Sequence, residues 1–109
     1  MIIPKDIDCI EITKPGGPEN LLLVKREMPK INLGEVLIRV KAAGVNRPDV
    51  MQRKGLYPPP PGASDIPGLE ISGEIVKINS KNSEFKLGDK VCALVSGGGY
   101  SSYCSAPIQ

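Results

Sequence analysis

Short apolar segments separated by turn-forming residues are the feature that most limits the folds open to this chain. The segments carry apolar side chains at alternate positions or in short runs, and they cover 9–13, 21–28, 36–42, 71–78, 91–95 and 100–106. Glycine, proline and asparagine interrupt the chain between them. Alternation with a period of two is typical of strands with one exposed face. This pattern predicts a mainly β fold, a small antiparallel barrel or sandwich whose sheet has one face in water.

One segment predicts a short α-helix instead of a strand. Asn46 is a favourable N-cap residue, Pro48 suits the first turn, and Asp49 complements the positive end of the helix dipole. Arg53 stands in the last turn, and Gly55 suits the left-handed position just beyond the C-terminus. The helix should therefore begin at Asn46 or Arg47 and end before Gly55.

Size and charge exclude several classes of function. A chain of 109 residues and 11.6 kDa corresponds to a single domain, residues 1–109, with one modest core. The 14 basic residues are spread along the chain among 12 acidic ones, so the net charge of +2 argues against a nucleic-acid partner. No apolar stretch is long enough for a membrane span, and the N-terminus lacks the features of a signal peptide. These observations predict a cytoplasmic protein without a membrane partner.

The three cysteines, Cys9, Cys92 and Cys104, are odd in number and widely spaced, which argues against a secreted disulfide framework. We expect reduced thiols that are buried or half-buried in strands, as free cysteines commonly are. The chain contains no histidine. Neither a zinc site of the usual ligands nor general-base catalysis by histidine can therefore be built, and we predict no metal site.

Residues 44–73 read GVNRPDVMQRKGLYPPPPGASDIPGLEISG. They resemble the catalytic-domain core of the medium-chain dehydrogenase/reductase superfamily, in the version that lacks zinc. Zinc alcohol dehydrogenases keep a Cys where this chain has Asn46, and a Gly-His-Glu where it has Gly68, Leu69 and Glu70. Three further segments, 15–21, 51–55 and 97–99, are similar to the p53-inducible branch of the quinone oxidoreductases.

The resemblance implies a GroES-like barrel that serves as the N-terminal catalytic domain of an enzyme. Such an enzyme would transfer hydride from NADPH to a quinone and could form a homodimer. In this family the dinucleotide sits on a Rossmann domain that follows the barrel, and its fingerprint has no counterpart before Gln109. We therefore expect an N-terminal part that is inactive alone. The alternative is a free-standing GroES-like binding module without enzymatic activity, which would need a long, mobile, apolar loop.

Two residues are the candidates for contact with the cofactor. Asn46, at the family's zinc-Cys position, could place its amide near the nicotinamide or the quinone oxygen, and this role is compatible with capping the helix. Tyr57 stands between Gly55 and the extended, polyproline-like segment Pro58–Pro61, where its ring offers a stacking face and a hydroxyl. By resemblance it matches a tyrosine that contacts NADPH and lines the quinone pocket. The alternative is an aromatic loop residue packed on the barrel.

No residue is assigned a catalytic role. Asp49 is interpreted as a helix-capping carboxylate and not as an acid or base. Glu70, after the Pro67–Leu69 corner, is interpreted as a structural carboxylate. The run Gly97–Gly99 lacks the spacing of a phosphate-binding loop, so it predicts a tight turn.

Overall fold

The structure is a computed structural model that describes residues 3–81 and 83–108. Its elements are β1 (Asp6–Ile12), a 3₁₀ turn (Pro18–Asn20), β2 (Leu21–Glu27), β3 (Glu35–Ala43), α1 (Arg47–Arg53), β4 (Glu70–Asn79), β5 (Lys90–Leu94) and β6 (Tyr103–Pro107). The prediction of a mainly β fold with one short α-helix is confirmed.

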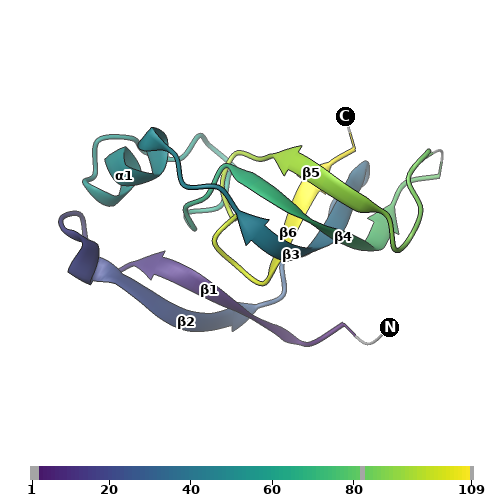
Figure 1. Cartoon of the computed structure of the whole chain (residues 1–109), viewed down its shortest axis with the longest axis horizontal. Coiled ribbons are helices and arrows are strands. Elements are labelled where there is room, and N and C mark those ends of the chain that lie inside the picture. The colour runs from purple at the N-terminus through teal and green to yellow at the C-terminus, as the bar shows by residue number, and fades with distance from the viewer. Residues whose placement is uncertain (1–2, 82, 109) are drawn as a thin grey trace.

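The strands form two antiparallel sheets (Figure 1). β1 and β2 make a hairpin, and the larger sheet has the order β5-β4-β3-β6. The hairpin lies beside the larger sheet and is joined to it through the segment just before β6. There the Ile10 N–H donates to the Tyr100 carbonyl at 2.8 Å, and the Ser102 N–H donates to the Asp8 carbonyl at 2.8 Å.

Two strands differ from their predicted limits, for different reasons. The strand predicted for 100–106 begins only at Tyr103, because the chain just before it turns toward β1: Ser101 bridges Cys9, and Ser102 is shared between the Asp8 carbonyl of β1 and the Val40 N–H of β3. β1 begins earlier than predicted, at Asp6, since exposed aspartates alternate there with buried Ile7 and Cys9. Because Asp6 and Asp8 are charged, the apolar face formed by Ile7 and Cys9 was not recognised as the start of a strand from the sequence.

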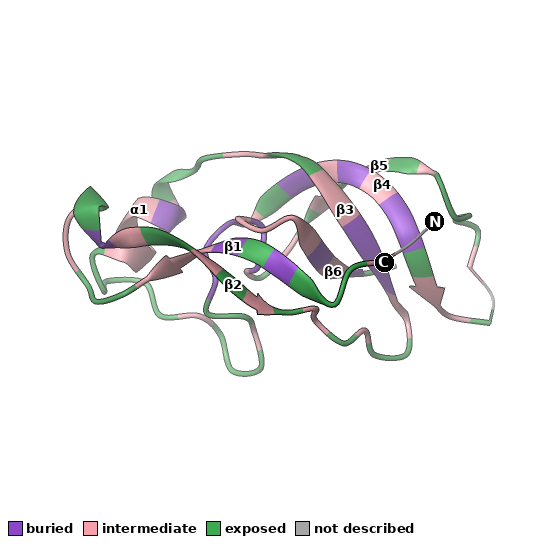
Figure 2. Ribbon diagram, turned by 90° about the horizontal axis from the view of Figure 1, so that it is seen from below, coloured by how far each residue is buried: buried purple, intermediate pink, exposed green. Residues whose placement is uncertain are grey.

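The core consists of two clusters of buried side chains, seen as purple bands on β1, β3 and β4 in Figure 2. The larger cluster lies on one face of the four-stranded sheet and contains Val36, Ile38, Ile71, Ile75, Cys104 and Ala106. The smaller cluster, Ile7, Cys9 and Ile66, joins the hairpin to the loop that precedes β4.

The prediction that the sheet has one face in water is wrong at one end. Leu37 alternates with the core residues Val36 and Ile38, so it lies on the opposite face, yet it is only 2% exposed. The linker Met28–Ile31 runs over this end and lines a groove together with Leu37. The linker thus covers apolar surface that strand periodicity alone assigns to solvent.

Both predicted ends of α1 are confirmed. Asn46 occupies the N-cap position with extended backbone angles. At the other end Gly55 has φ +82°, its N–H donates to the Gln52 carbonyl at 3.0 Å, and the Leu56 N–H donates to the Met51 carbonyl at 2.8 Å. This pair of bonds is the Schellman motif that a C-terminal glycine permits.

The C-terminus of α1 is also attached to the turn that follows β1. The Gly16 N–H donates to the Arg53 carbonyl at 2.8 Å, and the Arg53 Nε donates to the Gly16 carbonyl at 3.0 Å. This reciprocal pair fixes α1 at the end of the hairpin, where Figure 1 shows it.

Candidate cofactor and substrate site

Asn46 stands where β3 gives way to α1, and its side chain is exposed. Its Nδ2 donates to the Glu70 Oε1 at 3.4 Å, and the Gly44 N–H donates to the Glu70 backbone carbonyl at 2.9 Å. A Cβ at Gly44 would meet the Glu70 carboxylate, so a larger residue there would turn this carboxylate away from its present position beside Asn46. The exposed Glu70 carboxylate thus contacts the candidate residue Asn46, and its structural role stays a prediction.

The Asp49 carboxylate is buried beside Asn46, with 5% of the residue exposed. Its Oδ2 accepts from the Asn46 backbone N–H at 2.9 Å, which is the helix-capping contact that the sequence predicted. The same oxygen accepts from the Tyr100 hydroxyl at 2.7 Å. Sequence reasoning missed Tyr100, because it lies 51 residues away from Asp49 and no local pattern links the two.

The Tyr100 phenol is held in its neutral form. Burial and the hydrogen bond to Asp49 raise the pKa of this phenol above its usual range. The other carboxylate oxygen, Asp49 Oδ1, is buried without a partner among the described residues. The two hydrogen bonds to Oδ2 agree with the predicted role of Asp49 in capping the helix.

Tyr57 does not lie beside Asn46. It follows the C-terminus of α1, whereas Asn46 precedes the N-terminus, and the seven residues of this helix span roughly 10 Å. Its side chain is partly free, with 39% of the residue exposed. A ligand would have to be extended to reach both residues.

The loop after Tyr57 is held by hydrogen bonds near its C-terminal end, at Asp65. Pro60–Ala63 forms a β-turn, in which the Ala63 N–H donates to the Pro60 carbonyl at 3.0 Å and Gly62 has φ +83°. Asp65 then receives two bonds from the Arg26 guanidinium, at 2.7 and 3.3 Å, and its carbonyl accepts from Gln52 Nε2 at 3.0 Å. The hydrogen bonds from Arg26 hold the pKa of the Asp65 carboxyl below its usual value.

The glycine run 97–99 packs against the segment 64–68. Added Cβ atoms would lie 2.7 Å from the Ser64 carbonyl oxygen at Gly97 and 2.9 Å from the Gly68 backbone at Gly99. No helix begins at this run. The Gly98 and Gly99 N–H groups donate to the Ile66 and Gly68 carbonyls at 2.7 and 3.0 Å. The run is thus used for packing within the domain, with a bend at Ser96 and Gly97 where a tight turn was predicted.

The cysteines differ in their surroundings. Cys9 and Cys104 are buried as predicted, and burial raises the pKa of both thiols, to about 11 for Cys104. The prediction is wrong for Cys92, which is exposed because β5 is an edge strand whose alternate side chains face solvent. All three are free thiols.

Residues 3–81 and 83–108 form neither a cluster of metal-binding side chains nor a membrane-spanning helix. Within these residues no three His, Cys, Asp or Glu side chains gather into a set that could hold a metal ion. No helix formed by them is long and apolar enough to cross a membrane.

Comparison with known proteins gives the family. The family model of the alcohol dehydrogenase GroES-like domain matches residues 32–108. A synaptic vesicle membrane protein VAT-1 homolog of Danio rerio is 40% identical over 91 residues, which are 83% of this chain and 19% of that protein. A quinone oxidoreductase of Lama guanicoe is 37% identical over 100 residues, which are 90% of this chain and 30% of that protein.

Solved structures agree. The crystal structure of a human VAT-1 homolog-like protein superposes with a TM-score of 0.85 and 30% identity, covering 94% of this chain and 33% of that one. A mycobacterial protein complexed with NADPH superposes with a TM-score of 0.79 and 31% identity, covering 94% and 32%. The chain thus spans a fifth to a third of the length of these relatives. The relatives of this chain are named quinone oxidoreductases and VAT-1 homologs. The chain belongs to the alcohol dehydrogenase GroES-like domain family, within the medium-chain dehydrogenases/reductases.

Proposed function

We propose that residues 1–109 are the N-terminal catalytic domain of a cytoplasmic, zinc-independent, NADPH-dependent quinone oxidoreductase. The observation that carries the proposal is the exposed carboxamide of Asn46, held by Glu70 at the point where β3 meets α1. The names of the relatives and the NADPH complex of one structural neighbour support it.

The geometry gives the Asn46 carboxamide free hydrogen-bonding capacity. One amide hydrogen of Asn46 is directed to Glu70, and its side-chain oxygen takes part in the capping box with the backbone of Asp49, which leaves a second donor and one lone pair of that oxygen for a ligand. A quinone oxygen can accept from that donor, and a nicotinamide carboxamide can pair with both groups. The backbone of Asn46 is held at the N-cap by the Asp49 carboxylate, so the start of its side chain is positioned before the ligand arrives, and the 3.4 Å contact with Glu70 adds a weak preference for one orientation of the amide.

Tyr57 supplies a different kind of contact. Its ring is partly exposed and its segment is anchored at Asp65, so the ring offers a stacking face and a hydroxyl close to a restrained loop. Because α1 separates Tyr57 from Asn46, we assign the two residues to different parts of the bound ligands.

The described residues suit only part of NADPH, which supplies the hydride when it is bound. Asn46 fits the polar groups of the nicotinamide end, and Tyr57 offers a stacking face and a hydroxyl to another part of the bound ligands. No helix N-terminus with a glycine loop is present for the phosphates among the described residues, because the run 97–99 is packed against 64–68. We therefore expect the isolated chain to bind NADPH weakly and to show no turnover.

A chimera tests the proposal. Residues 1–109 would replace the matching N-terminal part of the Lama guanicoe quinone oxidoreductase, and NADPH oxidation would be followed with a quinone as acceptor. We expect turnover by the chimera and none by the isolated chain. Asn46→Ala or Tyr57→Ala in the chimera should raise KM several-fold, about 1 kcal/mol, with the circular dichroism spectrum unchanged. A folded chimera that binds NADPH but never reduces quinones would refute the proposal.

The alternative, a free-standing binding module, is not favoured by the loop geometry. A module of that kind would need a long mobile loop, yet the loop between α1 and β4 is tied by Asp65 to Arg26 and Gln52.

A further inference from the structure

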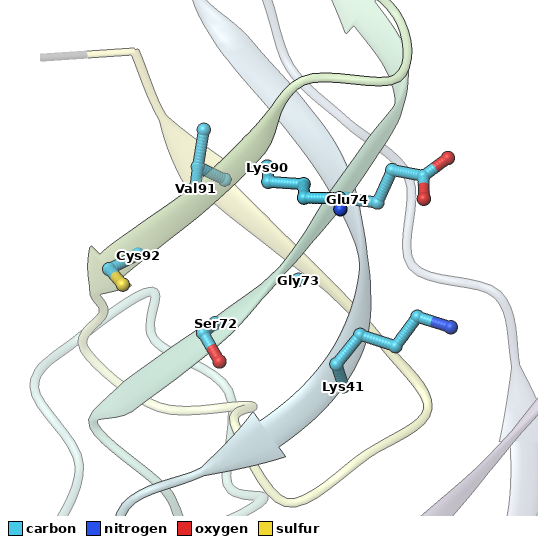
Figure 3. Close-up of a pocket in the computed structure, with 7 residues that line it drawn as sticks. All are labelled: Lys41, Ser72, Gly73, Glu74, Lys90, Val91 and Cys92. Atoms are coloured by element: carbon cyan, nitrogen blue, oxygen red, sulfur yellow. The ribbon is translucent and has the colours of Figure 1, made fainter.

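A groove that contains neither Asn46 nor Tyr57 lies where the linker Met28–Ile31 crosses one end of β3 and β4. Its volume is about 700 Å³, roughly twice the 330 Å³ of the groove drawn in Figure 3. Its lining is mostly apolar and comprises Ile3, Met28–Ile31, Leu37 and Lys77–Asn79. Ligand pockets typically have volumes of about 300–1,000 Å³ and mainly apolar walls with a few polar groups.

The walls of this groove, hereafter the linker groove, are fixed by hydrogen bonds at both ends of the linker. The Met28 N–H donates to the Lys5 carbonyl at 2.9 Å, and Asn79 Nδ2 donates to the Ile31 carbonyl at 3.2 Å. The buried side chain of Leu37 belongs to the same lining. The shape of the groove is thus set before any ligand arrives, which lowers the cost of binding.

The charged groups of the linker groove all have the same sign. Lys30 and Lys77 line it, no carboxylate does, and neither lysine has an ion-pair partner among the described residues. The groove in Figure 3 is different, because its Lys90 lies across from Glu74 on the neighbouring strand. An apolar groove with two uncompensated ammonium groups is complementary to an apolar molecule with an anionic head.

We propose that the linker groove binds a long-chain fatty carboxylate. The alkyl chain lies on Ile3, Met28 and Ile31, where burial removes apolar surface of both partners from water, and the buried Leu37 forms the floor beneath it. The carboxylate lies between Lys30 and Lys77 and accepts charge-assisted hydrogen bonds from them. The proposal uses none of the residues assigned to the redox site, and it stands or falls independently of the proposed oxidoreductase function.

Calorimetric titration of the 109-residue chain with dodecanoate tests this binding, with dodecanol as the uncharged counterpart. We expect one-to-one saturation by dodecanoate and affinity for dodecanol that is weaker by about tenfold. Lys30→Gln combined with Lys77→Gln should weaken dodecanoate binding by about tenfold or more. Lys41→Gln combined with Lys90→Gln removes the same charge from the groove in Figure 3 and should leave the affinity unchanged.

A steric variant separates the groove from general attraction to a basic protein. Ile31→Glu places a carboxylate inside the linker groove and should abolish binding while the circular dichroism spectrum stays that of the parent chain. Equal losses in the two double-lysine variants, equal affinity for dodecanol, or binding to phosphatidylglycerol vesicles without saturation by free dodecanoate would each overturn the proposal.

Discussion

At the scale of single residues, Asp49 connects parts of the chain that are distant in sequence. One of its carboxylate oxygens accepts from the backbone of Asn46 and from the hydroxyl of Tyr100. Hydrogen bonds to a charged, buried acceptor are among the stronger ones in proteins. The position of the candidate residue Asn46 thus depends on a tyrosine near the other end of the chain.

Tyr100→Phe removes one of these two bonds and leaves the ring in place. We expect the free energy of unfolding to fall by about 1–2 kcal/mol, measured by urea denaturation at neutral pH. Tyr103→Phe is the matched control, since no hydrogen bond of the Tyr103 hydroxyl is found among the described residues. Equal losses in the two variants would show that the bond to Asp49 contributes nothing specific.

The same variant should change the alkaline limb of the stability profile. The pKa of the Tyr100 phenol is raised in the folded chain above its ordinary value of 10.0, so unfolding releases a proton at higher pH. The stabilisation is complete below pH 10.0 and is lost as pH rises above it. Stability of the parent chain should therefore fall more steeply above that pH than stability of Tyr100→Phe.

At the scale of elements, α1 lies between the two candidate residues Asn46 and Tyr57, and its two ends are held by different contacts. The N-terminus depends on Asp49, and the C-terminus depends on Gly55 and on contact with the turn after β1. A Cβ at Gly55 would lie 2.9 Å from the Cβ of Pro15. Glycine is needed there both for its positive φ and for this close approach.

Gly55→Ala should lower the stability of the chain more than an alanine substitution at a glycine that has a positive φ but no close neighbour. We expect a loss of about 1–2 kcal/mol from the left-handed conformation, plus a further loss from displacement of Pro15. Gly34→Ala is the control, because Gly34 has φ +85° and nothing within 4 Å of an added Cβ. Thermal denaturation of both variants checks the difference; a smaller loss for Gly55→Ala than for Gly34→Ala would contradict the contact.

Local chemistry explains which elements could be predicted from the sequence. The limits of α1 follow from residues within or beside the helix, such as Asn46 and Gly55, and they were predicted correctly. The start of β6 and the exposure of Cys92 depend instead on which strands are neighbours. Tyr100 could not be found for the same reason, since its partner Asp49 is close only in the folded chain.

At the scale of the whole molecule, the four-stranded sheet is open. β5 is one edge of the sheet, and β6 is the other. Leu94 at the end of β5 is 81% exposed. Unpaired edge strands with exposed apolar side chains promote pairing with another chain, and a net charge of +2 provides little repulsion against it. We therefore expect the 109-residue chain to associate with itself as its concentration rises.

Leu94→Lys should weaken this association. A lysine on an edge strand places a charge where a second copy would pack and removes an apolar side chain whose burial is worth about 1.5–3 kcal/mol, so dimerisation should weaken by about tenfold or more. Leu33→Lys is the matched control: Leu33 is 79% exposed, similar to Leu94, but it lies in a turn and not on an edge strand. Sedimentation velocity over a range of concentrations distinguishes the variants, because both gain one positive charge and only Leu94→Lys alters the edge of the sheet. If both variants dimerise equally weakly compared with the parent chain, net charge and not the β5 edge controls the association. If both variants dimerise as strongly as the parent chain, the contact between copies lies elsewhere on the surface.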